Sequence, residues 1–336
     1  MNKEIDTATG ASKHHLEEIK ETPVNSPWPG PKGMIPVTSG QAEDANVHNR
    51  AYLDNILVEM RIIDAVEPKL ETEFFGRKYA SPINLAAVSH LNKVLEDKSR
   101  KPMQEKARAA KNLNVLNWIG MESDAEYRDI VSEGKDSVRI IKPFADHERI
   151  FNEIKVAQET GAVAVGIDID HVPGTNGKYD VVDGIELGPI TQVDLAKYAA
   201  FADVPFVAKG VLSVQDALKA RDAGCSAIVV SHHHGRLPFG VPPLQVLPQI
   251  KEALGNSKVT IFVDGSLMSG YDAYKALALG ADGVLIGRAI LRELLDHGTA
   301  AVEDKVVKMN EELSELMMYT GVKNTTSFDP NVLHFN

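Results

Sequence analysis

Residues 204–236, VPFVAKGVLSVQDALKARDAGCSAIVVSHHHGR, contain a complete strand, helix and strand. The apolar run Val204–Ala208 predicts the first strand, Ser213 is placed to cap the helix, and the run Ala227–Val230 predicts the second strand. Lys209 follows the first strand, and three histidines and an arginine follow the second. Because parallel strands joined by a helix end on one face, we expect these polar side chains to share one space.

From residue 83 onward, eight apolar runs alternate with helical patterns. Apolar strands that are each followed by a helix are typical of parallel sheets covered by helices. The pattern predicts an α/β fold, a (β/α)₈ TIM barrel with an N-terminal arm and a C-terminal helix, and a doubly wound sheet is the alternative. We expect strands at Ile83–Ala87, Leu113–Leu116, Val138–Ile141, Ala162–Ile167, Val204–Ala208, Ala227–Val230, Val259–Val263 and Gly283–Ile286, and helices at Lys93–Lys111 (kinked at Pro102), Ala125–Glu133, His147–Thr160, Gln192–Phe201, Leu244–Leu254 and Gly270–Leu279.

The segments outside the eight units predict an arm and a closing helix. We expect residues 1–75 to cap the barrel and residues 76–336 to form it, with a hairpin that turns at Gly76 between them. Further helices are expected around His14–Lys20, at Asp44–Leu57 and at Asp304–Met318.

Composition excludes several classes of protein. The 336 residues carry a formal charge of -11, which argues against nucleic-acid binding, so the partner is expected to be a small molecule. Cys225 is the only cysteine, so no disulfide within the chain is possible. No signal sequence and no membrane span is found in the sequence, and we expect a cytoplasmic protein.

Two glycine-containing loops predict a phosphate site. Asp264, Gly265 and Ser266 follow the seventh strand, and Gly287 and Arg288 follow the eighth. In TIM barrels these two loops commonly bind phosphate, because glycine lets backbone N–H groups approach the anion. Arginine can add two parallel hydrogen bonds, although the glycines could also serve only to make tight turns.

Three stretches carry a family resemblance. VPFVAKGV, IVVSHHHGR and FVDGSLMSGYDAYKALALGADGVLIGRAIL resemble the FMN-dependent α-hydroxy acid oxidases and dehydrogenases, the group of glycolate oxidase, lactate oxidase and flavocytochrome b2. The resemblance implies FMN across the carboxyl ends of the strands, hydride transfer to flavin N5 from a 2-hydroxy acid or a related carbinol, and a homo-oligomer, in this family a tetramer. The electron acceptor is left open, since oxygen, a quinone or a flavoprotein would leave no mark in the sequence.

The resemblance also implies roles for single residues. Lys209 would lie near flavin N1 and O2, His233 would be the catalytic base, and Arg236 would pair with the substrate carboxylate. Asp168 matches the family aspartate that steadies the protonated base. Further residues implied at the cofactor are Asp264, Gly265, Ser266, Gly287 and Arg288 at the ribityl phosphate, and Ser231, Ala86, Ala87 and Arg139.

These residue types suit the removal of a hydride from a carbinol carbon. A histidine titrates in the range where a general base is useful, and a fixed lysine stabilises the negative charge of reduced flavin. Arginine suits a carboxylate because its planar fork donates two hydrogen bonds. Only His233 stands three residues before Arg236, so His232 and His234 are expected to point elsewhere.

Several positions depart from the family and keep alternatives open. MIPVTSG carries Pro36 where the family has a tyrosine, VRIIKP offers Arg139 and Lys142 where it has glutamine and tyrosine, and Gly166 replaces a threonine. The segment between Asp170 and Phe201, which corresponds to the mobile lid of the family, is much shorter than usual. No certain equivalent of the lid's second carboxylate-binding arginine is found, and Lys178 is a candidate to replace it. The alternatives are a non-redox flavin isomerase resembling type 2 isopentenyl diphosphate isomerase, a flavin- or phosphate-binding protein without catalysis, and a metal-binding histidine cluster.

Overall fold

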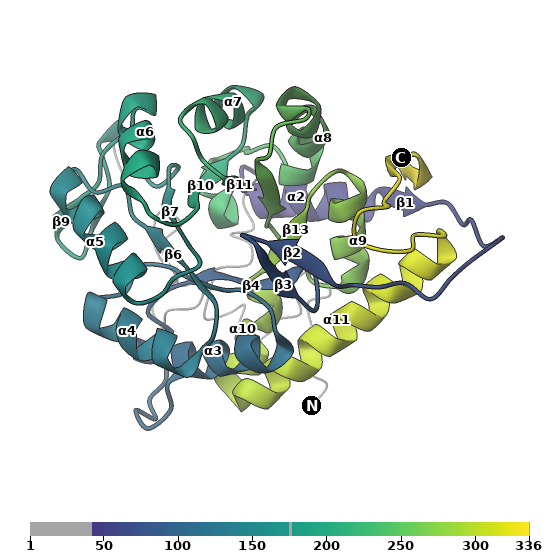
Figure 1. Ribbon diagram of the computed structural model, residues 1–336, viewed down its shortest axis with the longest axis horizontal. Coiled ribbons are helices and arrows are strands. Elements are labelled where there is room, and N and C mark those ends of the chain that lie inside the picture. Colours follow the sequence, from purple (N-terminus) through teal and green to yellow (C-terminus); the bar gives the residue numbers. More distant parts are fainter. Residues whose placement is uncertain (1–41, 175–176, 336) are drawn as a thin grey trace.

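A closed barrel of eight parallel strands forms the centre of the molecule. The computed structural model describes residues 42–174 and 177–335, and helices surround the barrel in this part of the chain (Figure 1). The (β/α)₈ prediction is therefore confirmed. In order around the barrel the strands are β10 (Phe206–Val211), β11 (Ala227–Val230), β12 (Thr260–Val263), β13 (Gly283–Ile286), β4 (Ile83–Val88), β5 (Asn117–Ile119), β6 (Ser137–Ile141) and β7 (Ala164–Asp168).

The outer helices begin at polar caps. Ser213, for example, accepts a hydrogen bond from the backbone N–H of Asp216, and Ser269 does the same for Asp272. The helices after the strands are α3 (Pro102–Leu113), α4 (Asp124–Glu133), α5 (His147–Glu159), α6 (Gln192–Phe201), α7 (Val214–Asp222), α8 (Pro243–Leu254), α9 (Gly270–Ala278) and α10 (Arg288–His297).

Two predicted boundaries near β5 are wrong. The helix expected at Lys93–Lys111 begins only at Pro102, because proline fits the first turn of a helix, where no N–H is needed. A short 3₁₀ helix, η1 (Leu91–Lys93), precedes it. The strand expected at Leu113–Leu116 is displaced to Asn117–Ile119, because α3 continues to Leu113.

Side chains alternate between two cores along each strand. On β6, Val138 and Ile140 belong to the core inside the barrel, whereas Ile141 belongs to the core between strands and helices. Since successive strand residues point to opposite faces, Arg139 faces the helices and Lys142, just beyond the strand, continues the inward series. This alternation decides which polar residues reach the site.

A hairpin closes the amino-terminal end of the barrel. β2 (Thr72–Phe74) and β3 (Arg77–Tyr79) pair around a turn at Gly76, as predicted, and lie over the barrel centre in Figure 1. Phe74 packs against Phe262 of β12, with ring centroids 4.8 Å apart. The hairpin therefore fills the closed end, which leaves the carboxyl ends of the strands for a site.

The two ends of the described chain meet on one side. β1 (Ile56–Val58) pairs with β14 (Leu333–Phe335), which follows the short 3₁₀ helix η4 (Pro330–Val332). The helix expected at Asp44–Leu57 ends at Asp54 as α2 (Ala45–Asp54), because the chain turns into β1. The short helix expected around His14–Lys20, and Pro36, lie outside the described residues.

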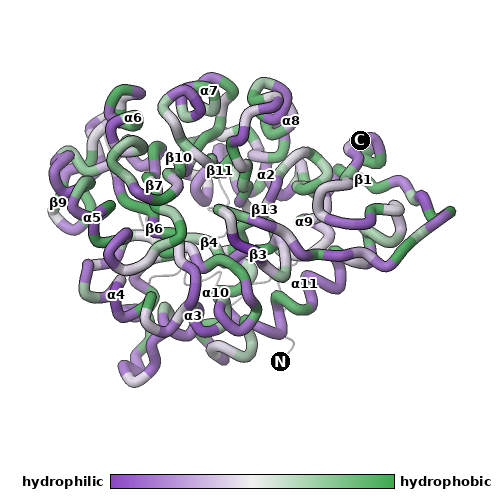
Figure 2. Tube along the Cα trace, viewed as in Figure 1, coloured by the Kyte–Doolittle hydropathy of each residue, from purple (hydrophilic) through white to green (hydrophobic). Residues whose placement is uncertain are grey.

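The C-terminal helix is α11 (Thr299–Tyr319), longer at both ends than the predicted Asp304–Met318. It packs on α9 and α3, and hydrophobic and hydrophilic residues alternate along it (Figure 2). A Cβ at Gly270 would collide with the carbonyl oxygen of Met309, so glycine permits this close approach. None of the helices in the described part of the chain has the length and apolar character needed to cross a bilayer.

Candidate active site

Three charged side chains meet at the carboxyl ends of β6, β7 and β10. The carboxylate of Asp168 lies 2.6 Å from Nζ of Lys142 and 3.1 Å from Nζ of Lys209. Burial alone would raise the pKa of Asp168, but the two ammonium groups hold it well below its ordinary value. Asp168 therefore stays ionised and bridges two buried lysines.

A second aspartate holds the histidine that was expected to be the base. Nδ1 of His233 lies 2.9 Å from Asp170 but 4.0 Å from Asp168. Asp168 was expected to be the aspartate that contacts this histidine. The prediction is wrong, because the closest carboxylate is that of Asp170. Asp170 continues the inward series of β7, and glycine at position 210 leaves room for it, since a Cβ at Gly210 would collide with the Asp170 side chain.

The charges around this pair favour a neutral imidazole. Burial, followed by the charge of Lys209, holds the pKa of His233 well below its ordinary value. Burial raises the pKa of Asp170 to about 6. At neutral pH the carboxylate is therefore ionised and accepts the Nδ1–H of His233, which leaves the Nε2 lone pair able to take a proton.

The expected carboxylate anchor, Arg236, contacts the short lid. Its Nη2 lies 3.1 Å from Oδ2 of Asp180, and Nε2 of His171 lies 2.8 Å from the same oxygen. Asp180 immediately precedes a small hairpin formed by β8 (Val181–Val182) and β9 (Ile185–Glu186). The ring of His171 in turn stands edge-on to that of His233, 5.7 Å away. Asp180 therefore connects the lid to Arg236 and His171 through charged contacts. Lys178, the candidate for the second carboxylate-binding residue of the lid, is exposed.

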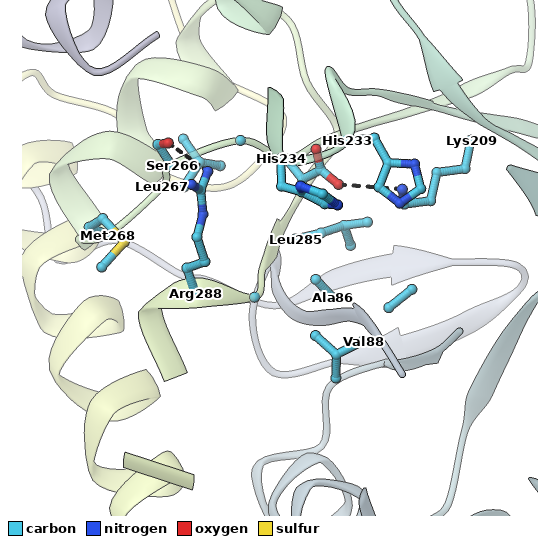
Figure 3. A pocket seen from close by; sticks show the side chains of 14 residues that line it. Ala86, Val88, Lys209, His233, His234, Ser266, Leu267, Met268, Leu285 and Arg288 are labelled. Carbon is cyan, nitrogen blue, oxygen red and sulfur yellow. Dashed lines mark hydrogen bonds and ion pairs between the residues drawn. The ribbon is translucent and has the colours of Figure 1, made fainter. Parts of the chain in front are cut away.

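An open cavity extends from His233 and Lys209 toward the loops after β12 and β13 (Figure 3). One end holds Lys209 and His233, and the other holds Ser266 and Arg288, whose Nη2 donates to the Ser266 hydroxyl over 2.8 Å. The lining residues are Ala86, Ala87, Val88, Lys209, His233, His234, Asp264, Gly265, Ser266, Leu267, Met268, Leu285, Gly287 and Arg288.

The donor set of this cavity fits an elongated anionic cofactor such as FMN. Burial lowers the pKa of Arg288 to about 10, so the guanidinium remains charged at neutral pH beside a hydroxyl and a glycine loop. Gly265 and Ser266 both have positive φ, 110° and 54°, in that loop. A cation at each end of the cavity, with small alanines along one wall, suits a phosphate at one end and a flat ring at the other.

Most residues expected at the cofactor line the cavity, but two do not. Arg139 was expected there, and this is wrong: its side chain lies between α4 and α5, 2.8 Å from Asp124 and 3.1 Å from Glu153, because it faces outward on β6. Ser231 lies behind the site, where its hydroxyl accepts the backbone N–H of His233.

The three histidines point in different directions and do not form a metal cluster. His232 is buried, and its Nδ1 accepts the backbone N–H of Gly235. His234 was expected to point away, but it lines the cavity. Asp168, Asp170 and His233 are close enough together to hold an ion, yet the two lysines on Asp168 oppose a cation there.

Sequence reasoning named Lys142 in place of a family tyrosine but gave it no role, and it did not find Asp170, His171 or Asp180. Alternation along β6 and β7 would have indicated Lys142 and Asp170, since each continues the inward series beyond its strand. No sequence signal indicates the contacts of Asp180, because they depend on how the lid folds back.

Comparisons with known proteins agree with a cavity that holds FMN. The FMN-dependent dehydrogenase family matches residues 31–201 and 188–335. The chain is 28% identical to 4-hydroxymandelate oxidase of Amycolatopsis orientalis (86% of this chain, 89% of the relative) and 26% identical to L-lactate oxidase of Lentilactobacillus hilgardii (87% of each). Human 2-hydroxyacid oxidase 1 is 26% identical, over 81% of this chain and 83% of the relative.

Solved structures of mandelate oxidase are also similar to this chain. One superposes with a TM-score of 0.78 at 27% identity and covers 89% of this chain and 92% of its own. Another, a mutant of that enzyme with a C4a-OH-FMN adduct, gives a TM-score of 0.76 at 27% identity and covers 89% and 93%.

Proposed function

The chain belongs to the FMN-dependent dehydrogenase family and oxidises 2-hydroxy acids with FMN, and we propose that His233 and Asp170 together remove the hydroxyl proton in this reaction. The observation that carries this proposal is the 2.9 Å contact between Nδ1 of His233 and the Asp170 carboxylate. When bound, FMN supplies the acceptor for the two electrons of the carbinol.

Proton removal relies on the charge of Asp170. As Nε2 takes the substrate proton, His233 becomes an imidazolium whose Nδ1–H still donates to Asp170. A carboxylate at this distance stabilises the cation and holds the ring orientation while the proton is bound. We propose that Asp168 acts differently, by holding Lys142 and Lys209 in the site.

Arg236 is our proposed anchor for the substrate carboxylate. Its guanidinium lies beside the catalytic pair and can donate to a planar carboxylate, but it also contacts Asp180. The substrate carboxylate therefore competes with, or shares, the contact made by Asp180. Lys142 is a second buried cation near His233 and adds positive charge to the same space.

The cofactor would lie along the cavity. We propose that Arg288, Ser266 and Gly265 hold its phosphate, that Asp264 and Gly287 line the adjoining segment, and that Lys209 lies beside the ring. A fixed ammonium group there stabilises negative charge that develops on the flavin as it is reduced. The relatives are named as oxidases and the family as FMN-dependent dehydrogenases, so the isomerase alternative is not supported.

Assembly and location are further proposals, the first from the resemblance and the second from the sequence. We propose a homotetramer that acts in the cytoplasm. The arm expected over residues 1–75 lies partly outside the described residues and stays a prediction. Size-exclusion chromatography with light scattering tests the first point and cell fractionation the second. The acceptor is found by comparing reoxidation with oxygen, a quinone and a flavoprotein.

An anaerobic titration tests the proposed function. The purified protein is loaded with FMN, and flavin absorbance is followed as lactate, glycolate, mandelate and longer 2-hydroxy acids are added. Bleaching by at least one acid, with the matching 2-keto acid as product, is the expected result. If no acid bleaches the flavin of a protein that binds FMN, the proposed chemistry is wrong for this chain.

A further inference from the structure

The imidazole of His234 faces the middle of the cavity. In Figure 3 it lies between Ser266 and Leu267 on one side and His233 and Lys209 on the other. His234 therefore lies between the proposed phosphate-binding residues, Ser266 and Arg288, and the residues proposed beside the flavin ring, Lys209 and His233. The proposed function gives His234 itself no role.

Neither ring nitrogen of His234 has a hydrogen-bond or ion-pair partner among the described residues. The ring only stands edge-on to that of His233, with centroids 5.2 Å apart. Burial, followed by His233 and the nearby cationic groups, holds the pKa of His234 well below its ordinary value. The ring is therefore neutral, and its one N–H donor and one lone pair are both available to a ligand in the cavity that it lines.

The backbone is strained in a way that aims this ring. His233, His234 and Gly235 have φ values of 46°, 52° and 88°, so two residues with a Cβ adopt the left-handed region in succession. This region is unfavourable for residues with a Cβ, and strain of this kind gathers at ligand sites.

Helix α2 holds the strained turn in place. The side chain of Asn46 donates to the carbonyl oxygen of His234 over 2.9 Å. A Cβ at Gly235 would lie 2.7 Å from the same amide, so the helix packs tightly on this turn. The direction of the His234 ring is therefore imposed by α2, which precedes the barrel in the sequence.

We infer that His234 is a cofactor-binding residue whose imidazole exchanges hydrogen bonds with the polyol chain of FMN. A hydroxyl both donates and accepts, which matches a neutral imidazole, and the polyol is the part of FMN that joins the phosphate to the ring. The inference rests on the proposed function, since it takes FMN as the cofactor.

Three flavins that differ by one part each test this inference. FMN has ring, polyol and phosphate, riboflavin lacks the phosphate, and lumiflavin lacks both polyol and phosphate. Dissociation constants are measured with apoprotein, by equilibrium dialysis and by flavin fluorescence, for the parent and for His234→Ala, His234→Asn and Arg288→Ala. Asparagine keeps a donor and an acceptor and tolerates the left-handed backbone.

His234→Ala should weaken FMN and riboflavin by the same factor, roughly tenfold for one lost hydrogen bond, and leave lumiflavin unchanged. His234→Asn should recover much of the loss. Arg288→Ala, as the matched control, should weaken FMN alone. Melting temperatures of the apoproteins should show that the variants remain folded.

Other patterns would overturn the inference. Unchanged FMN binding by His234→Ala would mean that the imidazole does not contact the cofactor. Tighter binding would mean that the imidazole occupies space that the cofactor needs. An equal loss for lumiflavin would place the contact on the flavin ring. Failure of the parent to bind FMN would instead overturn the proposed function, so the two failures can be distinguished.

Discussion

Replacing Asp170 with asparagine tests whether this carboxylate, and not Asp168, supports the base. Asparagine keeps the size and a hydrogen-bond acceptor but removes the negative charge. At 2.9 Å and an effective dielectric constant of about 20, the charge attracts an imidazolium by at most about 6 kcal/mol. A charged hydrogen bond contributes about 1.5–3 kcal/mol, so we take about 3 kcal/mol as the loss.

This loss corresponds to roughly a hundredfold slower flavin reduction, at about 1.36 kcal/mol per tenfold change. The assay is anaerobic stopped-flow bleaching of bound FMN by a substrate found in the titration. The dissociation constant for FMN should change little in Asp170→Asn, because the carboxylate is not among the residues that line the cavity.

Asp168→Asn is the matched comparison, with a different expected signature. Asp168 lies 4.0 Å from Nδ1 of His233 and neutralises Lys142 and Lys209. Removing its charge leaves two buried ammonium groups without their closest counter-ion, which typically costs about 3–5 kcal/mol of stability. Its melting temperature should therefore fall by several degrees, whereas that of Asp170→Asn should change much less.

The pH dependence separates the two aspartates further. Because the pKa of Asp170 is raised to about 6, the parent should lose its reduction rate as the pH falls through about 6, where the pair takes up a proton. In Asp170→Asn this limb should disappear, since the pKa of His233 itself lies well below its ordinary value. A near-normal rate in Asp170→Asn, with a large loss in a stably folded Asp168→Asn, would refute this assignment.

Three further predictions concern the surrounding charges. Lys209→Met should bind FMN but lose affinity for sulfite, whose flavin adduct is anionic, and equal bleaching by sulfite in variant and parent would place the lysine away from the flavin ring. Asp180→Asn should lower KM for a 2-hydroxy acid roughly tenfold with little change in the maximal reduction rate, because Arg236 loses a competing carboxylate, and a raised KM would mean that Asp180 orients the arginine. Burial lowers the pKa of Lys106 to about 7 in the folded state, against about 10.4 when unfolded, so the folded protein binds fewer protons between these values and its stability should rise with pH from about 7 to about 10. In Lys106→Met this rise should be smaller, as followed by thermal unfolding, and parallel curves for variant and parent would contradict the buried, weakly basic amine.

The pattern of neighbouring residues was sufficient to predict most strands of the barrel. Two of the eight strands, β11 and β13, have the bounds expected from their apolar runs, and the hairpin turns at Gly76 as expected. Apolar runs, caps and glycine turns are properties of neighbouring residues, so they can be read without knowing what packs on them. The error at β5 arose where an apolar stretch belongs partly to the end of a helix.

The sequence by itself determined the barrel, the glycine-containing loops after β12 and β13, and the order of Lys209, His233 and Arg236 along consecutive units. Only the tertiary structure decided which of two aspartates contacts His233 and where the neighbouring histidine points. Gly210 lets Asp170 approach, and α2 holds the turn after β11 in a left-handed conformation through Asn46. Both effects come from segments distant in the chain. Alternation places Asp168 and Asp170 on the same inward side of β7, so it cannot choose between them, and it does not extend to the turn after β11.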